Sequence, residues 1–297
     1  MILEILAVIA PVLVIIGLGW VWARARMPFD SPTIGNLVLR IGTPCLIFST
    51  LTGSETALDE MGRMVLAAVA VIALAMLIGM VVLRLVGLPW HTYLLAAMHG
   101  NSGNMGLPLA AMAFGVEGLA LAIAYFTVVS ISQNSLGLVV SAGKFDAGDL
   151  LRQPVIHAAA ITVAVLLLDL PVPGWLARTT ELLGGIVIPA MLILLGVALA
   201  QLTVRDLRLA LGISALRFGA GAVAALAVIF GLGLGGTEAG VVWIISVMPV
   251  AAMQIVFAER YGRSPERIAG VIVVSTLLTL LGLPLVVAAA WWLAGVG

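Results

Sequence analysis

The residues best suited to bind a ligand interrupt an apolar stretch near residue 100. Small, amide and hydroxyl side chains are concentrated between His99 and Pro108, at Gly100, Asn101, Ser102, Gly103, Asn104 and Gly106. Proline inside a helix removes a backbone donor and displaces the carbonyl of the preceding turn, so we expect two half-helices joined by an unwound segment. Side-chain amides and the free N–H groups of a half-helix N-terminus are groups that bind a carboxylate.

Amide side chains in two other apolar stretches are further candidates for the same site. Gln254 follows Pro249, a second proline inside an apolar stretch. Asn134, with Gln133 beside it, lies at helical spacing from the hydroxyl of Thr127. This stripe either faces the substrate or makes hydrogen bonds between packed helices, as polar residues commonly do in membranes.

The composition requires these stretches to lie in a membrane. Apolar residues make up 63% of the 297 residues and charged residues only 9%, whereas roughly a quarter of an ordinary soluble domain is charged. The apolar runs are continuous and do not alternate, which excludes a β-barrel. Since a helix needs roughly 20 residues to cross the hydrocarbon, we expect an all-α polytopic membrane protein with ten transmembrane helices, over residues 3–22, 34–52, 64–86, 93–114, 118–140, 154–170, 183–201, 208–232, 239–258 and 267–294.

Charges and reactive residues exclude several classes of function. Fourteen basic and fourteen acidic residues cancel, so the chain carries no basic field for nucleic acid. The single cysteine, Cys45, rules out a disulfide framework, and the three histidines show no metal-ligand spacing. The sequence holds no carboxylate pair and no phosphate-binding glycine motif. We therefore expect no enzyme activity, no metal and no cofactor.

The distribution of arginine and lysine predicts the orientation in the membrane. Ten of the fourteen basic residues lie in the odd-numbered connections between spans. Because basic connections stay on the cytoplasmic side, we expect both termini on the extracytoplasmic side of the cell inner membrane. Arg217 lies near the start of a span that begins on the cytoplasmic side. We therefore attribute its position to the same preference of basic residues for that side.

Local matches divide the chain into two similar halves. The segment around Pro44 matches the segment around Pro189, Pro108 matches Pro249, and a third match joins spans 5 and 10. With five spans in each half, the second half must be inverted. Interruptions at corresponding places in two repeats are the best sequence indication of a transporter's binding site. The expected divisions are a first repeat over 1–141, a cytoplasmic linker over 142–153 and a second repeat over 154–297.

The segments around these prolines resemble the auxin efflux carrier (AEC) family. The motifs that carry the resemblance are Asn101-Ser102, Met105-Gly106-Leu107-Pro108-Leu109, Met248-Pro249 and Phe257-Ala258-Glu259-Arg260-Tyr261-Gly262. That family includes the plant PIN carriers and bacterial permeases described as malonate or malate carriers. The resemblance covers essentially the whole chain, although the long cytoplasmic loop that the family carries after span 5 is missing here.

The resemblance implies an architecture and a mechanism. It implies a fold similar to sodium/proton antiporters and bile-acid symporters, in which helices 4 and 9 are broken and cross. It further implies a scaffold of helices 1, 2, 6 and 7, transport helices 3–5 and 8–10, and a homodimer through scaffold helices 2 and 7. In plant members an asparagine at the position of Asn101 contacts the substrate carboxylate. Pro44 and Pro189 would then be breaks in scaffold helices.

These observations predict a secondary transporter of small organic anions that works by alternating access. A sodium-coupled symporter of the bile-acid type and a channel are the alternatives, and coupling to Na⁺ or H⁺ stays open. No Arg or Lys lies within ten residues of Pro108 or Pro249, so we expect the anion to be held by amides and helix ends without a charged counter-ion. The expected binding residues are Asn101, Ser102, Asn104, Gln133, Asn134 and Gln254, with Gly100, Gly103, Gly106, Pro108 and Pro249 as hinges.

Overall fold

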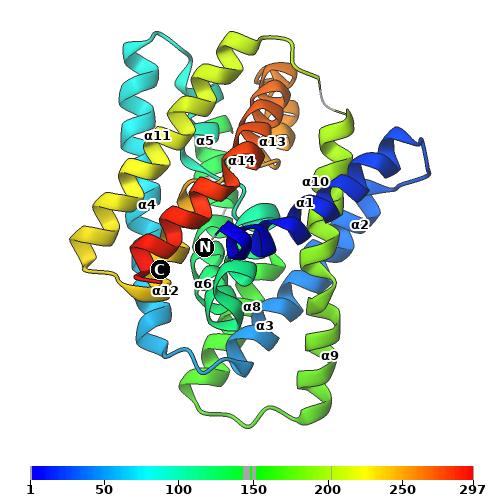
Figure 1. Ribbon diagram of the computed structural model, residues 1–297, viewed down its shortest axis with the longest axis vertical. Helices are drawn as coiled ribbons and strands as arrows, with labels where there is room; N and C mark the ends of the chain where they lie inside the picture. The colour runs from blue at the N-terminus through cyan, green and yellow to red at the C-terminus, as the bar shows by residue number, and fades with distance from the viewer. Residues whose placement is uncertain (1, 143–147, 149–151, 202, 297) are drawn as a thin grey trace.

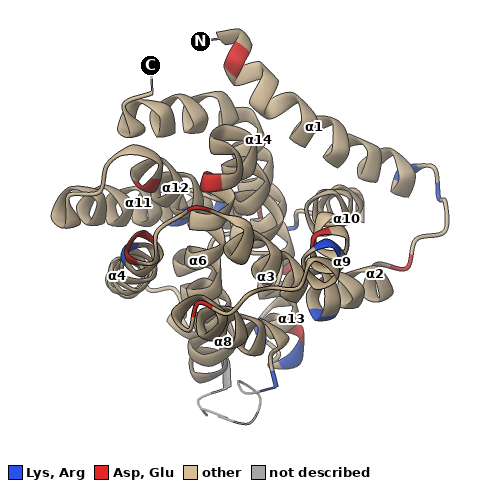
Figure 2. Ribbon diagram, turned by 90° about the horizontal axis from the view of Figure 1, so that it is seen from below, with Lys and Arg blue, Asp and Glu red and all other residues tan. Residues whose placement is uncertain are grey.

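The protein is a bundle of helices in the computed structural model, which describes residues 2–142, 148, 152–201 and 203–296. The described residues contain no β-strand, and a single pair, Gly100 and Val250, forms an isolated antiparallel bridge. The predicted linker over 142–153 falls for the most part outside the described residues. The two views agree in placing the chain ends near each other (Figures 1 and 2).

The chain forms α-helices joined by short connections and two π-helical turns, η1 and η2. In chain order they are α1 (Ile2–Arg24), α2 (Ser31–Leu37), η1 (Val38–Gly42), α3 (Thr43–Gly53), α4 (Leu58–Leu85), α5 (Trp90–Met98), η2 (Ser102–Gly106), α6 (Leu107–Ala142), α8 (Pro154–Leu167), α9 (Gly174–Gly185), α10 (Val187–Gln201), α11 (Leu207–Leu232), α12 (Gly236–Ser246), α13 (Gln254–Arg260) and α14 (Pro265–Ala294).

Within the described residues, seven helical stretches are long and apolar enough to cross a membrane. Four of the predicted spans coincide with single long helices, namely α1, α4, α11 and α14. Two more, 34–52 and 183–201, coincide with the stretches Ser31–Gly53 and Gly174–Gln201, each of which is made of consecutive helices. The remaining four predicted spans do not correspond one to one with such stretches. Residues 93–114 and 239–258 are each divided into shorter helices, and residues 154–170 contain α8, a helix of 14 residues. The structure therefore bears out a polytopic all-helical fold, and the count of ten spans stays a prediction.

Charges at the helix ends match the direction of the helix dipole. Glu4 lies in the first turn of α1 and Arg24 in its last turn. In the same way, α4 carries acidic residues in its first turn and Arg84 in its last. Most of the ribbon in Figure 2 is free of charge, and the charged residues lie chiefly at helix ends and in connections. Acidic N-termini and basic C-termini each stabilise a helix by typically 0.3–1 kcal/mol at exposed sites.

One predicted boundary differs from the structure, and another coincides with a break in a helix. The span predicted over 183–201 begins earlier, because α9 starts at Gly174 and leads into α10 with only Ile186 between them. Arg178 therefore belongs to α9, although the predicted spans leave residues 171–182 as a connection. The boundary predicted between spans 93–114 and 118–140 coincides with Gly115, where α6 is interrupted by non-helical backbone angles, with φ 64° and ψ −147°.

The chain stays helical at Pro44 and Pro189. Pro44 occupies the first turn of α3, directly after η1, and the Thr43 hydroxyl donates to the Val38 carbonyl at 2.9 Å. Pro189 lies in the first turn of α10, after Ile186, which keeps right-handed helical angles. Proline is tolerated in a first turn because its missing N–H would have no partner there. The helical path therefore continues through both positions.

Two groups of helices pack side by side. In Figure 1, α1, α2, α9 and α10 gather on one side and α4, α5, α11 and α12 on the other. Helices α1 and α10 approach closely at two glycines. A Cβ at Gly19 would lie 2.2 Å from the Ile193 carbonyl oxygen, and one at Gly196 would lie 2.0 Å from that of Ile16. Small residues at such contacts let membrane helices pack backbone to backbone.

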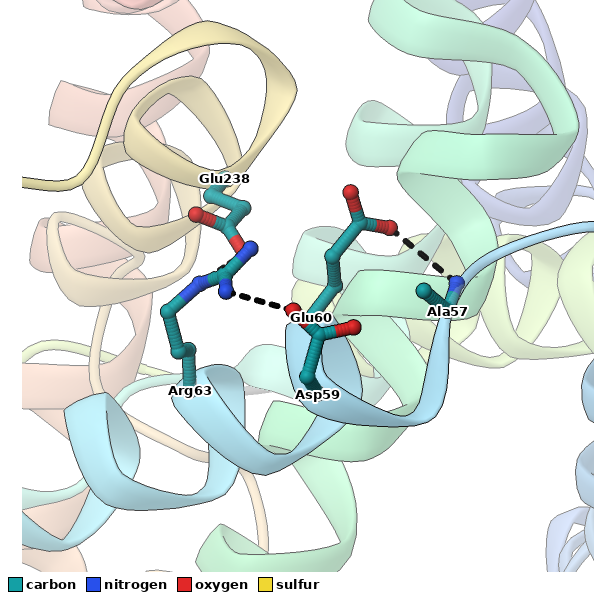
Figure 3. A network of polar contacts seen from close by, with 5 residues as sticks. All are labelled: Ala57, Asp59, Glu60, Arg63 and Glu238. Carbon is teal, nitrogen blue, oxygen red and sulfur yellow. Dashed lines mark hydrogen bonds and ion pairs between the residues drawn. The ribbon is translucent and has the colours of Figure 1, made fainter.

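An ion-pair network joins α4 to α12 at their N-terminal ends (Figure 3). Arg63 donates to Glu238 at 2.9 Å and to Asp59 at 2.8 Å. The Ala57 N–H donates to Glu60 at 3.2 Å, which caps the start of α4. The side chain of Arg63 is 43% exposed and that of Glu238 is 13% exposed. The network therefore links the N-terminal end of α4 to that of α12, whose opposite end, Ser246, precedes an unwound segment around Pro249.

Candidate functional site

Two interrupted helices meet through their backbones. Helix α5 ends at Met98 and α12 ends at Ser246. The Asn101 N–H donates to the Pro249 carbonyl at 2.7 Å, and the Ala251 N–H donates to the His99 carbonyl at 3.3 Å. We call residues 99–101 and 249–251 the paired segments. Each paired segment forms hydrogen bonds with backbone groups of the other that are not bonded within a helix. Unwound chain inside a membrane requires such partners.

A buried arginine joins the ends of both half-helices. Arg217 of α11 is 2% exposed, and its guanidinium donates to three backbone carbonyls. The acceptors are Ala97 of α5 at 2.9 Å, Met248 at 3.1 Å, and Ser246, the last residue of α12. The C-terminal end of a helix carries partial negative charge on its free carbonyls. One cation therefore stabilises two helix ends from opposite halves of the chain.

Two glycines make room for this arrangement. A Cβ at Gly100 would lie 2.8 Å from a terminal nitrogen of Arg217 and 3.1 Å from the Met248 oxygen. A Cβ at Gly221, one turn beyond Arg217 on α11, would lie 2.0 Å from the Ser246 carbonyl oxygen. By contrast, a Cβ at Gly106 would have no contact shorter than 3.4 Å. Close approach therefore requires glycine at 100 and 221.

Asn101 and Gln254 each bury an amide nitrogen that has no partner. Asn101 is 5% exposed and Gln254 is 4% exposed. The Oδ1 atom of Asn101 accepts a long hydrogen bond of 3.4 Å from the Asn104 N–H. Neither the Asn101 Nδ2 nor the Gln254 Nε2 has a hydrogen-bond partner among the residues that the structure describes. An unpartnered buried polar group costs about 1–3 kcal/mol, so both amides are suited to a ligand that supplies acceptors.

His99 and Ser102 border the same region. The Nε2 atom of His99 lies 2.9 Å from the Ser132 hydroxyl, while its Nδ1 has no partner among the described residues. Ser102 is buried at the start of η2, and its N–H donates to the Gly100 carbonyl at 2.8 Å. The neutral ring of a histidine carries one donor and one acceptor nitrogen, so Nδ1 can donate or accept a hydrogen bond, depending on the tautomer.

A small closed cavity lies beside the arginine. It has a volume of about 10 Å³, which is about the space of one water. The Tyr125 hydroxyl lies 3.1 Å from that of Ser246, and both residues line the cavity. Its other polar lining residues are Ser102 and Arg217. In this conformation the space beside Arg217 is too small for a carboxylic acid.

The remaining predicted residues lie elsewhere or have other partners. Asn134 donates to the Ser130 carbonyl of its own helix at 2.9 Å, so its amide is already engaged. Gln133 and Asn104 are half-buried. Pro249 lies in the paired segments, whereas Pro108 is the second residue of α6, beyond η2. The two prolines that match in sequence therefore occupy different places in their helices.

Arg217 is the residue that the sequence analysis missed. We expected no counter-ion near the two prolines, and that expectation is wrong, because the Arg217 guanidinium bonds Met248, next to Pro249. Distance along the sequence misled us, since Arg217 lies 31 residues from Met248 and 120 from Ala97. A signal was present: Arg217 lies ten residues inside the apolar helix α11, and a charged residue within a membrane helix is a functional candidate by default.

The described residues contain no group of three or more His, Cys, Asp or Glu side chains that could hold a metal ion. The polar groups at or beside the paired segments are amides, hydroxyls, the imidazole of His99, backbone carbonyls and one guanidinium. The amides and the guanidinium offer hydrogen-bond donors to an anion.

Comparison with known proteins agrees with this description. A family model described as "Membrane transport protein" matches residues 4–144 and 138–287. An uncharacterized transporter of Methanothermobacter thermautotrophicus is 28% identical over 272 residues, which cover 86% of this chain and 88% of that protein. An uncharacterized transporter of Methanocaldococcus jannaschii is 24% identical over 265 residues, or 84% and 86% of the two chains. The chain therefore belongs to the family of membrane transport proteins that includes the auxin efflux carriers.

Proposed function

We propose that the protein is a secondary carrier of small carboxylate anions, with its binding site at the paired segments. Membership of a membrane transport family gives the general activity. The observation that supports an anion is a set of donors in or next to the paired segments: the amides of Asn101 and Gln254, which have no partner among the described residues, and the charge of Arg217, which bonds the Met248 carbonyl. Charge-assisted hydrogen bonds contribute about 1.5–3 kcal/mol each. After desolvation and ordering costs, we expect micromolar to millimolar affinity.

The proposed mechanism is alternating access between two inverted repeats. Helix contacts in one half have counterparts in the other. The packing of α1 on α10 corresponds to that of α8 on α3, and the packing of α4 on α6 corresponds to that of α11 on α14. These pairs support a scaffold formed by predicted spans 1, 2, 6 and 7, with predicted spans 3–5 and 8–10 moving against it. The closed cavity beside Arg217 fits a state in which the site is shut.

Location and assembly complete the proposal. We propose that the chain spans the cell inner membrane with both termini on the extracytoplasmic side, because basic residues concentrate in the odd-numbered connections. We further propose a homodimer through the second and seventh predicted spans (residues 34–52 and 183–201). The outer faces of these spans carry exposed apolar side chains at Ile41 and Ile186. Cross-linking of single cysteines at these two positions in membranes tests the dimer.

Uptake into proteoliposomes tests the carrier. Purified protein should take up a labelled mono- or dicarboxylate saturably and show counterflow, which separates a carrier from a channel. Thermal-shift screening of carboxylates against the purified protein identifies the anion to use, because a ligand that binds only the folded state raises its stability.

Substitution of Asn101 tests the site. Asn101→Ala should lower uptake at least about tenfold, because a lost charge-assisted bond of 1.5–3 kcal/mol corresponds to that factor or more. Asn101→Asp should be worse, since it puts a negative charge against the anion. Asn134→Ala is the matched control, because the Asn134 amide is bonded to its own helix. If Asn101→Asp transports the anion as well as the wild type, the site is misplaced or the substrate is not an anion.

A further inference from the structure

The positive charge of Arg217 has carbonyls as partners and no carboxylate. Among the residues that the structure describes, no ion pair includes Arg217. Its hydrogen-bond acceptors are the backbone oxygens of Ala97, Ser246 and Met248. Arginine does not lose its proton in proteins. A permanent unit charge is therefore held inside the bundle by the dipoles of two interrupted helices.

The same oxygens form the donor set of an alkali-cation site. In carriers with broken helices, the unwound carbonyls and the C-terminal ends of half-helices coordinate the coupling Na⁺. Here Ala97 precedes the end of α5, Ser246 is the end of α12, and Met248 lies in the unwound segment that follows. All three carbonyls are already bonded to one cation, which is part of the protein.

We infer that Arg217 is a tethered cation that takes the place of a coupling Na⁺ between the two half-helix ends. Gly100 and Gly221 support this inference, because any larger residue at either position would collide with the guanidinium or with the Ser246 carbonyl. The cavity of about 10 Å³ beside the guanidinium leaves no room for a second, hydrated cation. The arrangement is thus complete without an ion from solution.

Two consequences follow. The first concerns stability alone: the two half-helix ends need a cation, whatever the protein transports. The second rests on the proposed function: anion uptake needs no Na⁺, and the charge of Arg217 attracts the anion toward the amides of Asn101 and Gln254. The two consequences are measured separately, so failure to find a transported anion leaves the first one testable.

Thermal unfolding of purified protein tests the first consequence. The wild type should unfold at the same temperature in NaCl as in choline chloride of equal concentration. Arg217→Met removes the charge and keeps the length of the side chain, and it should lower the unfolding temperature on the order of 10 °C. Arg217→Lys keeps the charge and should lose less than half as much. Arg208→Met is the control, because Arg208 is exposed on the same helix.

Cation rescue identifies the site as one for a cation. Arg217→Ala leaves space beside the three carbonyls, so millimolar guanidinium or 100 mM Na⁺ or Li⁺ should raise its unfolding temperature by about 2 °C or more above choline. The inference is overturned if Arg217→Met is as stable as Arg217→Lys, or if none of the three cations stabilises Arg217→Ala. A Na⁺-specific rise in the wild type overturns it as well, and that measurement needs no variant.

Uptake measurements test the second consequence. Replacement of external Na⁺ by choline should leave the initial rate of anion uptake by the wild type unchanged within twofold. A loss of uptake of tenfold or more without Na⁺ would show that a cation from solution is required, and would overturn the inference. If no carboxylate is taken up in either salt, the proposed function fails, while the unfolding measurements still decide the role of Arg217.

Discussion

Gly221 lies where α11 comes closest to the end of α12, and replacing it by alanine tests the packing around Arg217. The added Cβ would lie 2.0 Å from the Ser246 carbonyl oxygen and 3.2 Å from a terminal nitrogen of Arg217. Contacts shorter than 3.0 Å are essentially never found for a Cβ, so the two backbones must separate by about 1 Å or more. That separation stretches the bond from Arg217 to Ser246.

The expected cost follows from three contributions. Overpacking a well-packed interior costs about 1–3 kcal/mol. Weakening a hydrogen bond from a charged donor costs up to about 1.5–3 kcal/mol. Alanine recovers about 1 kcal/mol of helix propensity over glycine. The net loss for Gly221→Ala is about 1.5–5 kcal/mol, which corresponds to a fall in unfolding temperature on the order of 3–10 °C.

The assay is thermal unfolding of protein purified in detergent, followed with a dye that becomes fluorescent on reaction with a thiol. The single cysteine, Cys45, is half-buried and becomes reactive when the protein unfolds. Gly219→Ala is the matched control, because Gly219 is on the same helix and a Cβ there would meet no atom within 4 Å. This control should unfold at the wild-type temperature or slightly above it.

Equal unfolding temperatures would refute the reasoning. If Gly221→Ala unfolds within about 2 °C of Gly219→Ala, the ends of α11 and α12 can separate at little cost. The contacts of Arg217 with both half-helices would then not depend on the close approach at Gly221.

Three further predictions concern other parts of the chain. In a cysteine-free background, a cysteine at Glu55 should react with an impermeant reagent added to intact cells, while one at Arg263 should not; the reverse pattern would invert the proposed topology. Ser132→Ala removes the hydroxyl that bonds the His99 ring and should cost about 1–3 kcal/mol, measured as a fall in unfolding temperature; no change would mean that the ring needs no partner. The Asp30 carboxylate accepts bonds from the Thr33 hydroxyl at 2.6 Å and from its N–H at 3.1 Å, which lower the pKa of Asp30 below its ordinary value of 3.8. Because the pKa is lower in the folded state, this stabilisation is present above about pH 4 and is lost as the pH falls through the lowered pKa. Asp30→Ala should therefore lower the unfolding temperature more at pH 7 than at pH 3; an equal effect at both values would contradict this assignment.

Features that depend on local composition could be predicted from the sequence. The long helices α1, α4, α11 and α14 contain continuous apolar runs, and their bounds follow from where those runs stop, except that α4 begins at Leu58, before the predicted start at residue 64. The interruption after Met98 follows from glycines and amides that disfavour a helix. Asn101 and Gln254 stood out because an amide is costly to bury without a partner.

Features that depend on contacts between distant segments could not be predicted. The bonds of Arg217 join α11 to residues as far as 120 positions away, and no periodicity records such a contact. Arg178 looked like part of a connection because its segment is polar, yet the chain continues as helix there. Pro108 and Pro249 match in sequence, which suggested equivalent breaks in the two repeats. In the structure the chain is unwound at Pro249, whereas Pro108 lies inside α6. Sequence identity at a position does not fix how the backbone accommodates a proline.

The reciprocal contact of Gly19 and Gly196 has a consequence for synthesis of the protein. The glycine face of α1 is complementary to α10, which begins about 160 residues after α1 ends. At roughly 5–20 residues per second, the ribosome needs on the order of 10–30 s to make the intervening chain. During that time α1 must wait in the bilayer with its grooved face against lipid or the insertion machinery. Helix α1 is therefore made long before the helix that covers its glycine contact.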